Sequence, residues 1–273
     1  MKTPKQSIVR IDSKMPGPVL AIVTGVHGDE LTGPYALSEI LQNLRISRGR
    51  VYAIYANPPA LEKEVRQLNK NLNRCFSVDN TGHSYEDKRA REIMAIFNKC
   101  DAVLDLHAFN EPSGEPFVMT EPEGIEVAKI FDVGIISTNW TQAEADTTDG
   151  YMHSNGKVGI CLECGPIPKY QDYIQFTKNS IYQFLSYYGV LNEPHQPSTS
   201  SKIIIEAKYS VVSTGEQVEF SKNFKSFDNL VPNEIFCTQG KSSYVARTNE
   251  CIIFPRPLAK AGSELFVIGN QQD

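Results

Sequence analysis

Long apolar runs alternate with amphipathic stretches over residues 1–192 of the chain. The apolar runs lie at 18–24, 51–55, 102–106 and 158–164. Such runs are typical of parallel strands that are buried on both faces. The amphipathic stretches lie at 31–44, 85–97 and 170–188, and Ser84 stands where it can cap the second one. Strands that alternate with helices predict an α/β fold with a mixed, mainly parallel sheet flanked by helices.

The pattern changes after residue 192. Residues 192–201 are polar and carry Pro194 and Pro197, which is typical of a linker between domains. Short runs rich in β-branched and aromatic residues follow at 203–205, 209–212, 217–220, 235–237, 251–254 and 265–268. We therefore predict two domains, an α/β domain over 1–192 and a small C-terminal all-β domain over 200–273.

The composition excludes several classes of partner. With 273 residues, 41% hydrophobic and 22% charged, the chain resembles an ordinary soluble globular protein. Its formal net charge of −5 gives no reason to expect nucleic acid or an anionic membrane as a partner. No apolar run reaches the ~18–20 residues that a membrane span needs, and residues 1–7 lack the apolar core of a signal peptide. We therefore expect a cytoplasmic protein that binds neither nucleic acid nor membranes.

Candidate metal ligands follow two of the predicted strands. His27 and Glu30 come directly after the first run, and three residues on the first turn of a helix would place both side chains on one face. An imidazole and a carboxylate are two of the three protein ligands of a typical catalytic zinc site. His107, at the end of the third run, is the best candidate for the third ligand. Because ligands bind at the carboxyl ends of parallel strands, we expect these side chains to converge.

Other polar residues fit the same edge of the sheet. Glu163 lies near the end of the fourth run, where a carboxylate could take a proton from a zinc-activated water. Arg66 and Arg74 lie in a basic segment and are available to stabilise negative charge. Asp105, two residues before His107, fits either a partner that orients the imidazole or a polar residue at a strand end, and the sequence leaves both open.

Five short segments stand along the chain: GVHGDE at 25–30, NPPAL at 57–61, NLNR at 71–74, DLH at 105–107 and LECG at 162–165. They occur in the order found in the succinylglutamate desuccinylase/aspartoacylase family, which the chain resembles. The tail adds IIFPRPL at 252–258, which is similar to a segment of that family's C-terminal β domain. The resemblance implies a zinc carboxypeptidase-like fold for most of the chain.

The resemblance also implies roles for individual residues. One zinc ion per chain would be held by three side chains, those of His27, Glu30 and His107. Glu163 would be the general base and acid, and Arg66 would polarise the scissile carbonyl. Asn73 and Arg74 match the pair that binds a substrate carboxylate, a task that suits a planar guanidinium.

The chain departs from the family at one position. Ten residues before the catalytic glutamate, these amidohydrolases tend to carry an arginine that reads a second acidic group, and this chain has His153 there. A histidine is cationic only part of the time near neutral pH. We expect His153 to line the substrate pocket, and we expect a substrate other than N-acetylaspartate or succinylglutamate.

These observations predict a zinc-dependent amidohydrolase that cleaves the amide bond of a small N-acyl amino acid carrying a carboxylate. A metallocarboxypeptidase acting on short peptides is the first alternative, but an added β domain could roof the cleft against long peptides. A zinc- or carboxylate-binding module without catalysis is the second, but such a module has no use for Glu163. The sequence is compatible with a homo-oligomer and does not identify the acyl group or the amino acid.

Overall fold

A computed structural model describes residues 6–111 and 113–272 of the chain. The chain divides into two compact units. The first runs to Ile136 and resumes at Ala145–Lys202, and the second takes Ser137–Glu144 and the chain from Ile203 onward. The division into domains at 1–192 and 200–273 stays a prediction. Residues 1–5, which belong to the segment expected to lack a signal peptide, lie outside the described residues.

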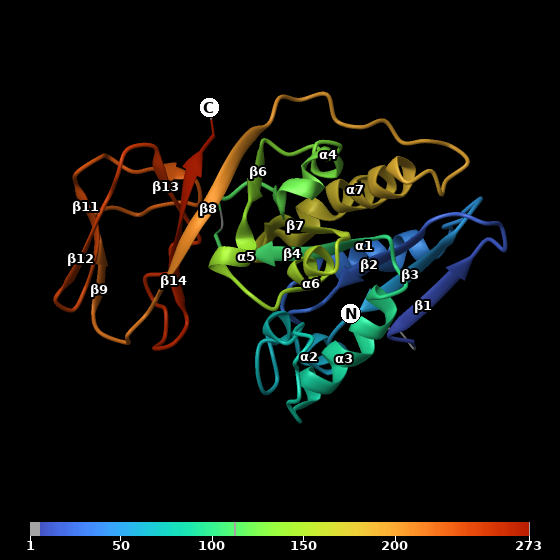
Figure 1. The fold of residues 1–273 in the computed structure, drawn as a ribbon, viewed down its shortest axis with the longest axis horizontal. Coiled ribbons are helices and arrows are strands. Elements are labelled where there is room, and N and C mark those ends of the chain that lie inside the picture. The colour runs from blue at the N-terminus through green and yellow to red at the C-terminus, as the bar shows by residue number, and fades with distance from the viewer. Residues whose placement is uncertain (1–5, 112, 273) are drawn as a thin grey trace. The chain divides into compact units, whose positions relative to one another are not determined.

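The first unit is built on a mixed sheet with the strand order β1-β3-β2-β4-β7-β5, and β6 lies next to β5 (Figure 1). The strands are β1 (Ile8–Asp12), β2 (Val19–Thr24), β3 (Arg50–Tyr55), β4 (Ala102–Phe109), β5 (Phe117–Thr120), β6 (Ile135–Thr138) and β7 (Val158–Pro166). β2 pairs in parallel with β3 and β4, and β4 pairs in parallel with β7. β1 and β5 are antiparallel to their neighbours. The predicted mixed, mainly parallel sheet is confirmed.

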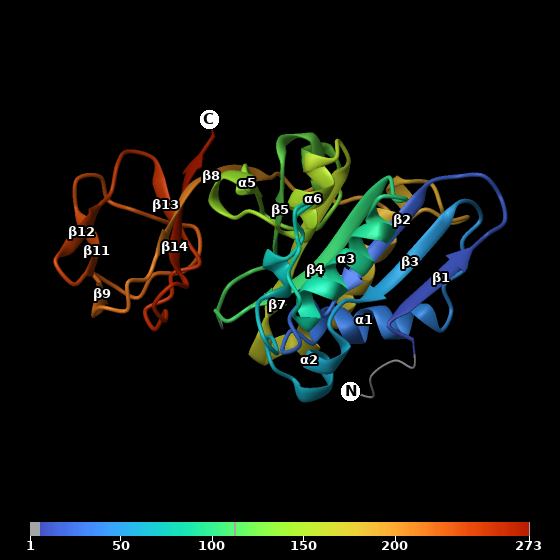
Figure 2. The same cartoon turned by 60° about the horizontal axis from the view of Figure 1, so that its bottom comes forward.

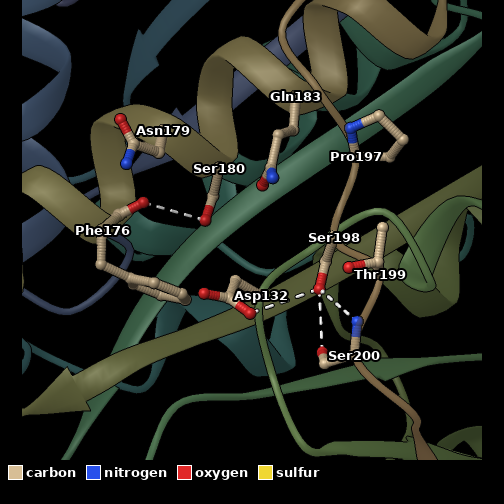
Figure 3. A pocket seen from close by; sticks show the side chains of 9 residues that line it. All are labelled: Asp132, Phe176, Asn179, Ser180, Gln183, Pro197, Ser198, Thr199 and Ser200. Atoms are coloured by element: carbon tan, nitrogen blue, oxygen red, sulfur yellow. Dashed lines mark hydrogen bonds between the residues drawn. The ribbon is translucent and has the colours of Figure 1, made fainter.

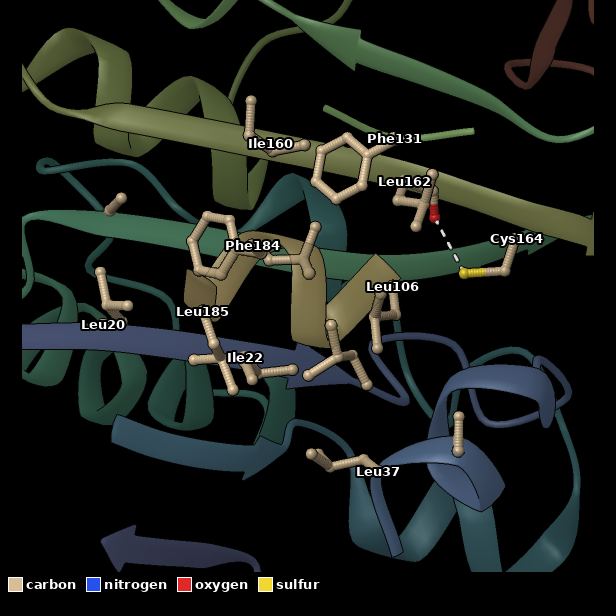
Figure 4. Close-up of a cluster of buried hydrophobic side chains, with 14 of the residues drawn as sticks. Leu20, Ile22, Leu37, Leu106, Phe131, Ile160, Leu162, Cys164, Phe184 and Leu185 are labelled. Carbon is tan, nitrogen blue, oxygen red and sulfur yellow. Dashed lines mark hydrogen bonds between the residues drawn. The ribbon is translucent and has the colours of Figure 1, made fainter. Parts of the chain in front are cut away.

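Helices cover both faces of this sheet (Figures 1 and 2). On one face, α1 (Thr32–Leu41) and α7 (Ile174–Tyr187) bury Leu37, Phe184 and Leu185 against alternate strand residues such as Leu106 and Leu162 (Figure 4). On the other face, α3 (Tyr85–Phe97) and α6 (Thr148–Ser154) pack on a second apolar cluster. Because successive strand side chains point to opposite faces, each buried strand serves both clusters. The first unit also contains α2 (Pro58–Lys63), α4 (Ile125–Ala128) and the 3₁₀ turns Leu72–Arg74, Pro122–Gly124 and Ile167–Tyr173.

The helix predicted at 85–97 has those bounds in the structure. Ser84 Oγ accepts a hydrogen bond from Asp87 N at 3.1 Å, and Asp87 Oδ2 accepts one from Ser84 N at 3.0 Å. This capping box satisfies two backbone donors at the helix start. Apolar residues at helical spacing, including Ile93 and Phe97, are fully buried.

The helix predicted at 170–188 is only partly correct. Ile167–Tyr173 forms a 3₁₀ helix, and α7 begins at Ile174. Lys169 departs from helical geometry with φ −116° and ψ 23°, so the chain bends before the regular helix starts. Helical periodicity does not distinguish the two kinds of turn, because i and i+3 neighbours occur in both.

The second unit contains two antiparallel sheets and the short helix α5 (Trp140–Ala143). One sheet holds β8 (Ile203–Val212), β14 (Glu264–Gln271), β13 (Glu250–Ile253) and β10 (Asp228–Asn229). The other holds β12 (Ser242–Val245), β11 (Ile235–Gln239) and β9 (Val218–Phe220). The rings of Phe224 and Phe266 both pack against the ring of Phe236, and the three residues form an aromatic core. The small C-terminal β region is confirmed, and the runs at 203–205 and 209–212 prove to be one strand.

None of the helices in the described ranges is both long enough and apolar enough to cross a membrane.

Candidate metal centre

His27 and Glu30 lie in the turn that connects β2 to α1. The prediction that they sit on the first turn of a helix is wrong, because α1 begins only at Thr32. Glu30 N donates to His27 O at 3.5 Å, so a single turn rather than a helix brings the two side chains together. Gly28 permits the close packing of this turn, since a Cβ there would lie 2.1 Å from the carbonyl carbon of Ala60.

The three predicted ligands form one buried cluster. Potential ligand atoms of His27, Glu30 and His107 all lie within 4.8 Å of one another. His27 Nδ1 lies 2.6 Å from Glu30 Oε1, and His107 Nδ1 lies 3.1 Å from Glu30 Oε2. Each of the three residues is less than 5% exposed. The two histidines come from different strand ends, as the sequence predicted, and the carboxylate lies between them.

The outer nitrogen of each imidazole has an acceptor of its own. His27 Nε2 lies 2.8 Å from Asn71 Oδ1. The same Asn71 atom accepts a hydrogen bond from Asn73 N at 2.9 Å, which identifies it as the amide oxygen rather than the amide nitrogen. His107 Nε2 lies 2.8 Å from Asp105 Oδ2. Each Nε2 thus donates to its acceptor, so Nδ1 is the nitrogen that a neutral ring presents to a cation beside the Glu30 carboxylate. Asp105 lies inside β4 and contacts the imidazole of His107, which favours the first of its two interpretations, a partner that orients the ring, over a polar residue at a strand end.

This arrangement fits a divalent cation. When both imidazoles are neutral, their two Nδ1 lone pairs and the Glu30 carboxylate are all acceptors, a donor set that suits a cation placed among them. Glu30 is held in place by Ala108 N, which donates to Oε2 at 3.0 Å, and by Arg66 Nη1, which donates to Oε1 at 3.2 Å. Two histidines and one carboxylate with oriented rings form the ligand set of a catalytic zinc site. The cluster can therefore hold one metal ion.

Burial and charge shift the pKa values of the two histidines in opposite directions. Burial lowers the pKa of His27, and the nearby Glu30 carboxylate only partly offsets it. Burial also acts to lower the pKa of His107, but Asp105 and Glu30 outweigh it and raise the pKa well above its usual value. A carboxylate behind an imidazole increases its basicity, which strengthens it as a metal ligand.

Glu163 lies beside the cluster through the register of the sheet. It is the Cα partner of His107 in the parallel pairing of β4 with β7. Registered neighbours point to the same face from strands ~4.8 Å apart. Glu163 is 6% exposed. The structure therefore places this carboxylate next to a candidate ligand.

The predicted substrate-binding residues occupy the segment beside His27. The Arg66 side chain is 39% exposed while it contacts Glu30, so it faces both the cluster and solvent. Asn73 Oδ1 accepts from Thr148 N at 3.0 Å, which leaves the Asn73 amino group as the end that can donate to an anion. Arg74 is exposed, and its Nη1 donates to Asn73 O at 2.7 Å.

The structure does not bring His153 to the cluster. Its Nε2 lies 2.9 Å from Gly159 O and 3.2 Å from Glu121 N. Gly159 precedes Glu163 by four residues on β7, a rise of ~13 Å along a strand. The role predicted for His153 in lining the substrate pocket has no support from this position, and its Nδ1 is buried without a hydrogen-bond partner among the described residues.

A separate pocket of about 400 Å³ lies between α7 and residues 197–200 (Figure 3). Its polar groups bond to one another, as where Ser198 Oγ donates to Asp132 Oδ1 at 3.3 Å. It contains none of the predicted site residues.

Comparison with known proteins gives the family. A model of the succinylglutamate desuccinylase/aspartoacylase catalytic domain matches residues 16–188, which is more than half of the chain. The chain is 28% identical over 205 residues to a probable aspartoacylase of Nostoc sp., a match that covers 68% of this chain and 69% of that protein. It is also 28% identical over 170 residues to the N-acyl-aromatic-L-amino acid amidohydrolase (carboxylate-forming) of Xenopus tropicalis, which covers 55% of each chain.

Several of these relatives are matched over only about half of their length, as the frog enzyme shows. The structural similarity covers a larger share of both chains than these sequence matches do. The crystal structure of succinylglutamate desuccinylase from Vibrio cholerae superimposes with a TM-score of 0.81 at 18% identity, over 97% of this chain and 85% of that one. The resemblance that the short segments indicated is confirmed, and the chain belongs to the succinylglutamate desuccinylase/aspartoacylase family.

Proposed function

We propose that this protein is a zinc-dependent amidohydrolase that cleaves the amide bond of a small N-acyl amino acid. The observation that carries the proposal is the convergence of His27, Glu30 and His107 with oriented imidazoles, next to Glu163 in the sheet. The name of the frog relative supports the substrate class, since it specifies an amidohydrolase and an N-acyl amino acid.

The ligands would be Nδ1 of His27, Nδ1 of His107 and the Glu30 carboxylate. Zinc in such a site supplies Lewis acidity and a water that loses its proton at a pH of ~7. Asn71 and Asp105 hold the imidazoles in the tautomer that presents Nδ1.

Glu163 is the proposed general base and acid. Its carboxylate takes the proton of the attacking water as the carbon–oxygen bond forms at the carbonyl. It returns that proton to the amine nitrogen as the carbon–nitrogen bond breaks. The products are a carboxylate and a free amino acid, and Glu163 is regenerated.

Arg66, Asn73 and Arg74 would bind the substrate's negative charges. The half-exposed guanidinium of Arg66 beside Glu30 is suited to the oxygen of the carbonyl that becomes charged. The amino group of Asn73 and the exposed guanidinium of Arg74 are suited to the carboxylate of the amino acid.

Glu163→Gln tests the proposal on zinc-loaded protein with a panel of N-acyl amino acids and short peptides. We expect normal zinc content and a loss of hydrolysis of ~10²- to 10⁴-fold. Glu250→Gln is the matched control, because Glu250 is also buried, at 5% exposed, and accepts from Arg247 N in the second unit. Hydrolysis that survives in Glu163→Gln would refute the role of Glu163, and a preference of the wild type for peptides would replace the proposed substrate class.

A further inference from the structure

The residues that orient the two imidazoles are connected to each other through α6. On the His27 side, Asn71 Oδ1 accepts from His27 Nε2 at 2.8 Å and from Asn73 N at 2.9 Å. Asn73 Oδ1 then accepts from Thr148 N at 3.0 Å. These bonds form a continuous path from one imidazole to the first residue of α6.

The same residue reaches the other imidazole through its side chain. Thr148 Oγ1 donates to Asp105 Oδ2, which also lies 2.8 Å from His107 Nε2. Thr148 and Asp105 are both fully buried. One threonine therefore serves the His27 side with its backbone and the His107 side with its hydroxyl.

We propose that Thr148 is a positioning residue that fixes the imidazoles of His27 and His107 relative to each other for metal binding. The inference rests on the metal centre of the proposed function, but it does not depend on hydrolysis. Thr148 contacts neither imidazole directly, so it acts through Asn73 and Asp105.

The hydroxyl has a specific electrostatic task. Asp105 Oδ1 has no hydrogen-bond partner among the described residues, so Oδ2 receives both the Thr148 hydroxyl and the His107 imidazole. Without the hydroxyl, this buried carboxylate keeps only the imidazole as a partner, and its orientation is no longer fixed. The imidazole that it holds then loses its defined direction toward the metal.

Three variants separate this role from ordinary packing. Thr148→Val removes the hydroxyl, keeps the backbone N–H and nearly conserves the volume. Thr148→Ser restores the hydroxyl. Thr147→Val is the control. The Thr147 hydroxyl caps α6 by accepting a hydrogen bond from Gly150 N at 3.0 Å, so its removal weakens the same helix without touching the Thr148–Asp105 bond.

The measurements use the metal alone as the probe. Zinc affinity is obtained by competition with a chromophoric chelator, and the absorption spectrum of the Co²⁺-substituted protein reports on ligand geometry. We expect Thr148→Val to weaken zinc binding ~10- to 100-fold and to alter the Co²⁺ spectrum. Thr148→Ser should stay close to the wild type, and Thr147→Val should lower the melting temperature while it keeps the affinity and the spectrum.

Unchanged affinity and spectrum in Thr148→Val would overturn the proposal, as would an equal loss in Thr147→Val. If the valine does not fold, Thr148→Ala avoids a methyl group against the carboxylate of Asp105, and the same loss is expected. A wild type that binds no zinc would overturn this inference together with the metal centre. Failure of Glu163→Gln to reduce hydrolysis would refute only the catalytic proposal, because the zinc affinities do not depend on it.

Discussion

Glu86 gives a prediction about the segment that carries Arg66. This carboxylate is fully buried near the start of α3. Its Oε1 accepts from Leu68 N at 3.0 Å and from Asn69 N at 3.1 Å, and its Oε2 accepts from Asn69 Nδ2 at 3.3 Å. Glu86→Gln should therefore loosen the segment directly after Arg66 while it leaves the sheet intact.

The magnitude follows from these three bonds. Hydrogen bonds to a charged group contribute ~1.5–3 kcal/mol, and neutral ones contribute ~0.5–1.5 kcal/mol. Glutamine keeps an oxygen for the two backbone donors, but its amino group cannot accept from Asn69 Nδ2. Water can partly replace the lost bonds because Asn69 is exposed. We expect the free energy of local opening to fall by about 2 kcal/mol, which is a factor of ~30 in the opening equilibrium.

Amide hydrogen exchange measures this directly. The Leu68 and Asn69 amides should exchange ~30-fold faster in Glu86→Gln, and urea unfolding should show a smaller change. Glu92→Gln is the control on the same helix, because the Glu92 side chain is 59% exposed and pairs with Arg89 of α3. Unchanged protection of the two amides in Glu86→Gln would show that the carboxylate does not hold the segment.

The pH dependence of this protection has a defined sign. Burial acts to raise the pKa of Glu86, but the donors of Asn69 and Leu68 outweigh it and lower the pKa below its ordinary value of 4.5. The stabilisation is therefore present above pH 4.5 and is lost as the pH falls through the lowered folded-state pKa. Glu86→Gln should lack this acid-dependent loss.

Three further changes test other parts of the account. Asp105→Asn should weaken zinc binding ~10- to 100-fold in a chelator competition, since an amide is a poorer acceptor for His107, and unchanged affinity would contradict the proposed orientation of that ring. Gly28→Ala should destabilise the fold by about 1–3 kcal/mol in urea unfolding, because the new Cβ overlaps the backbone of α2, and wild-type stability would mean that the turn can relax. The Lys70 ion pair, with the capping box, lowers the pKa of Asp87 to about 2, so its contribution is present above its ordinary pKa of 3.8 and is lost between pH 4 and pH 2. Asp87→Asn should remove that part of the acid sensitivity in unfolding experiments over this range, and an unchanged pH profile would count against the interpretation.

The elements that the sequence predicted are those whose pattern is local. β2, β4 and β7 are buried on both faces, so each appears as a mainly apolar run, which Asp105 and His107 interrupt in β4 and Glu163 interrupts in β7. α3 carries its own capping residues at Ser84 and Asp87. In these cases the residues that determine the element are neighbours in the chain.

The elements that the sequence missed depend on distant partners. β1 is an edge strand of partly exposed residues that is held by antiparallel pairing with β3, and its sequence alone shows no buried run. β5 is a short strand that lies between β7 and β6 in the sheet. The turn at His27 depends on packing against α2, which the spacing of His27 and Glu30 does not reveal.

The candidate site shows the same division. His27, Glu30, His107 and Glu163 were predicted because strand ends converge at one edge of a parallel sheet. Asn71 lies within a segment that indicated the family, but its bond to an imidazole 44 residues away had no signal in the sequence. Thr148 contacts a carboxylate 43 residues away, and threonine at a helix start is ordinary.

Anomalous diffraction at the zinc edge from crystals of zinc-loaded protein tests the central claim most directly. The account predicts one strong peak per chain, ~2.0–2.2 Å from Nδ1 of His27, Nδ1 of His107 and an oxygen of Glu30. Absence of a peak at this cluster, or zinc bound through Nε2 of either histidine, would contradict it.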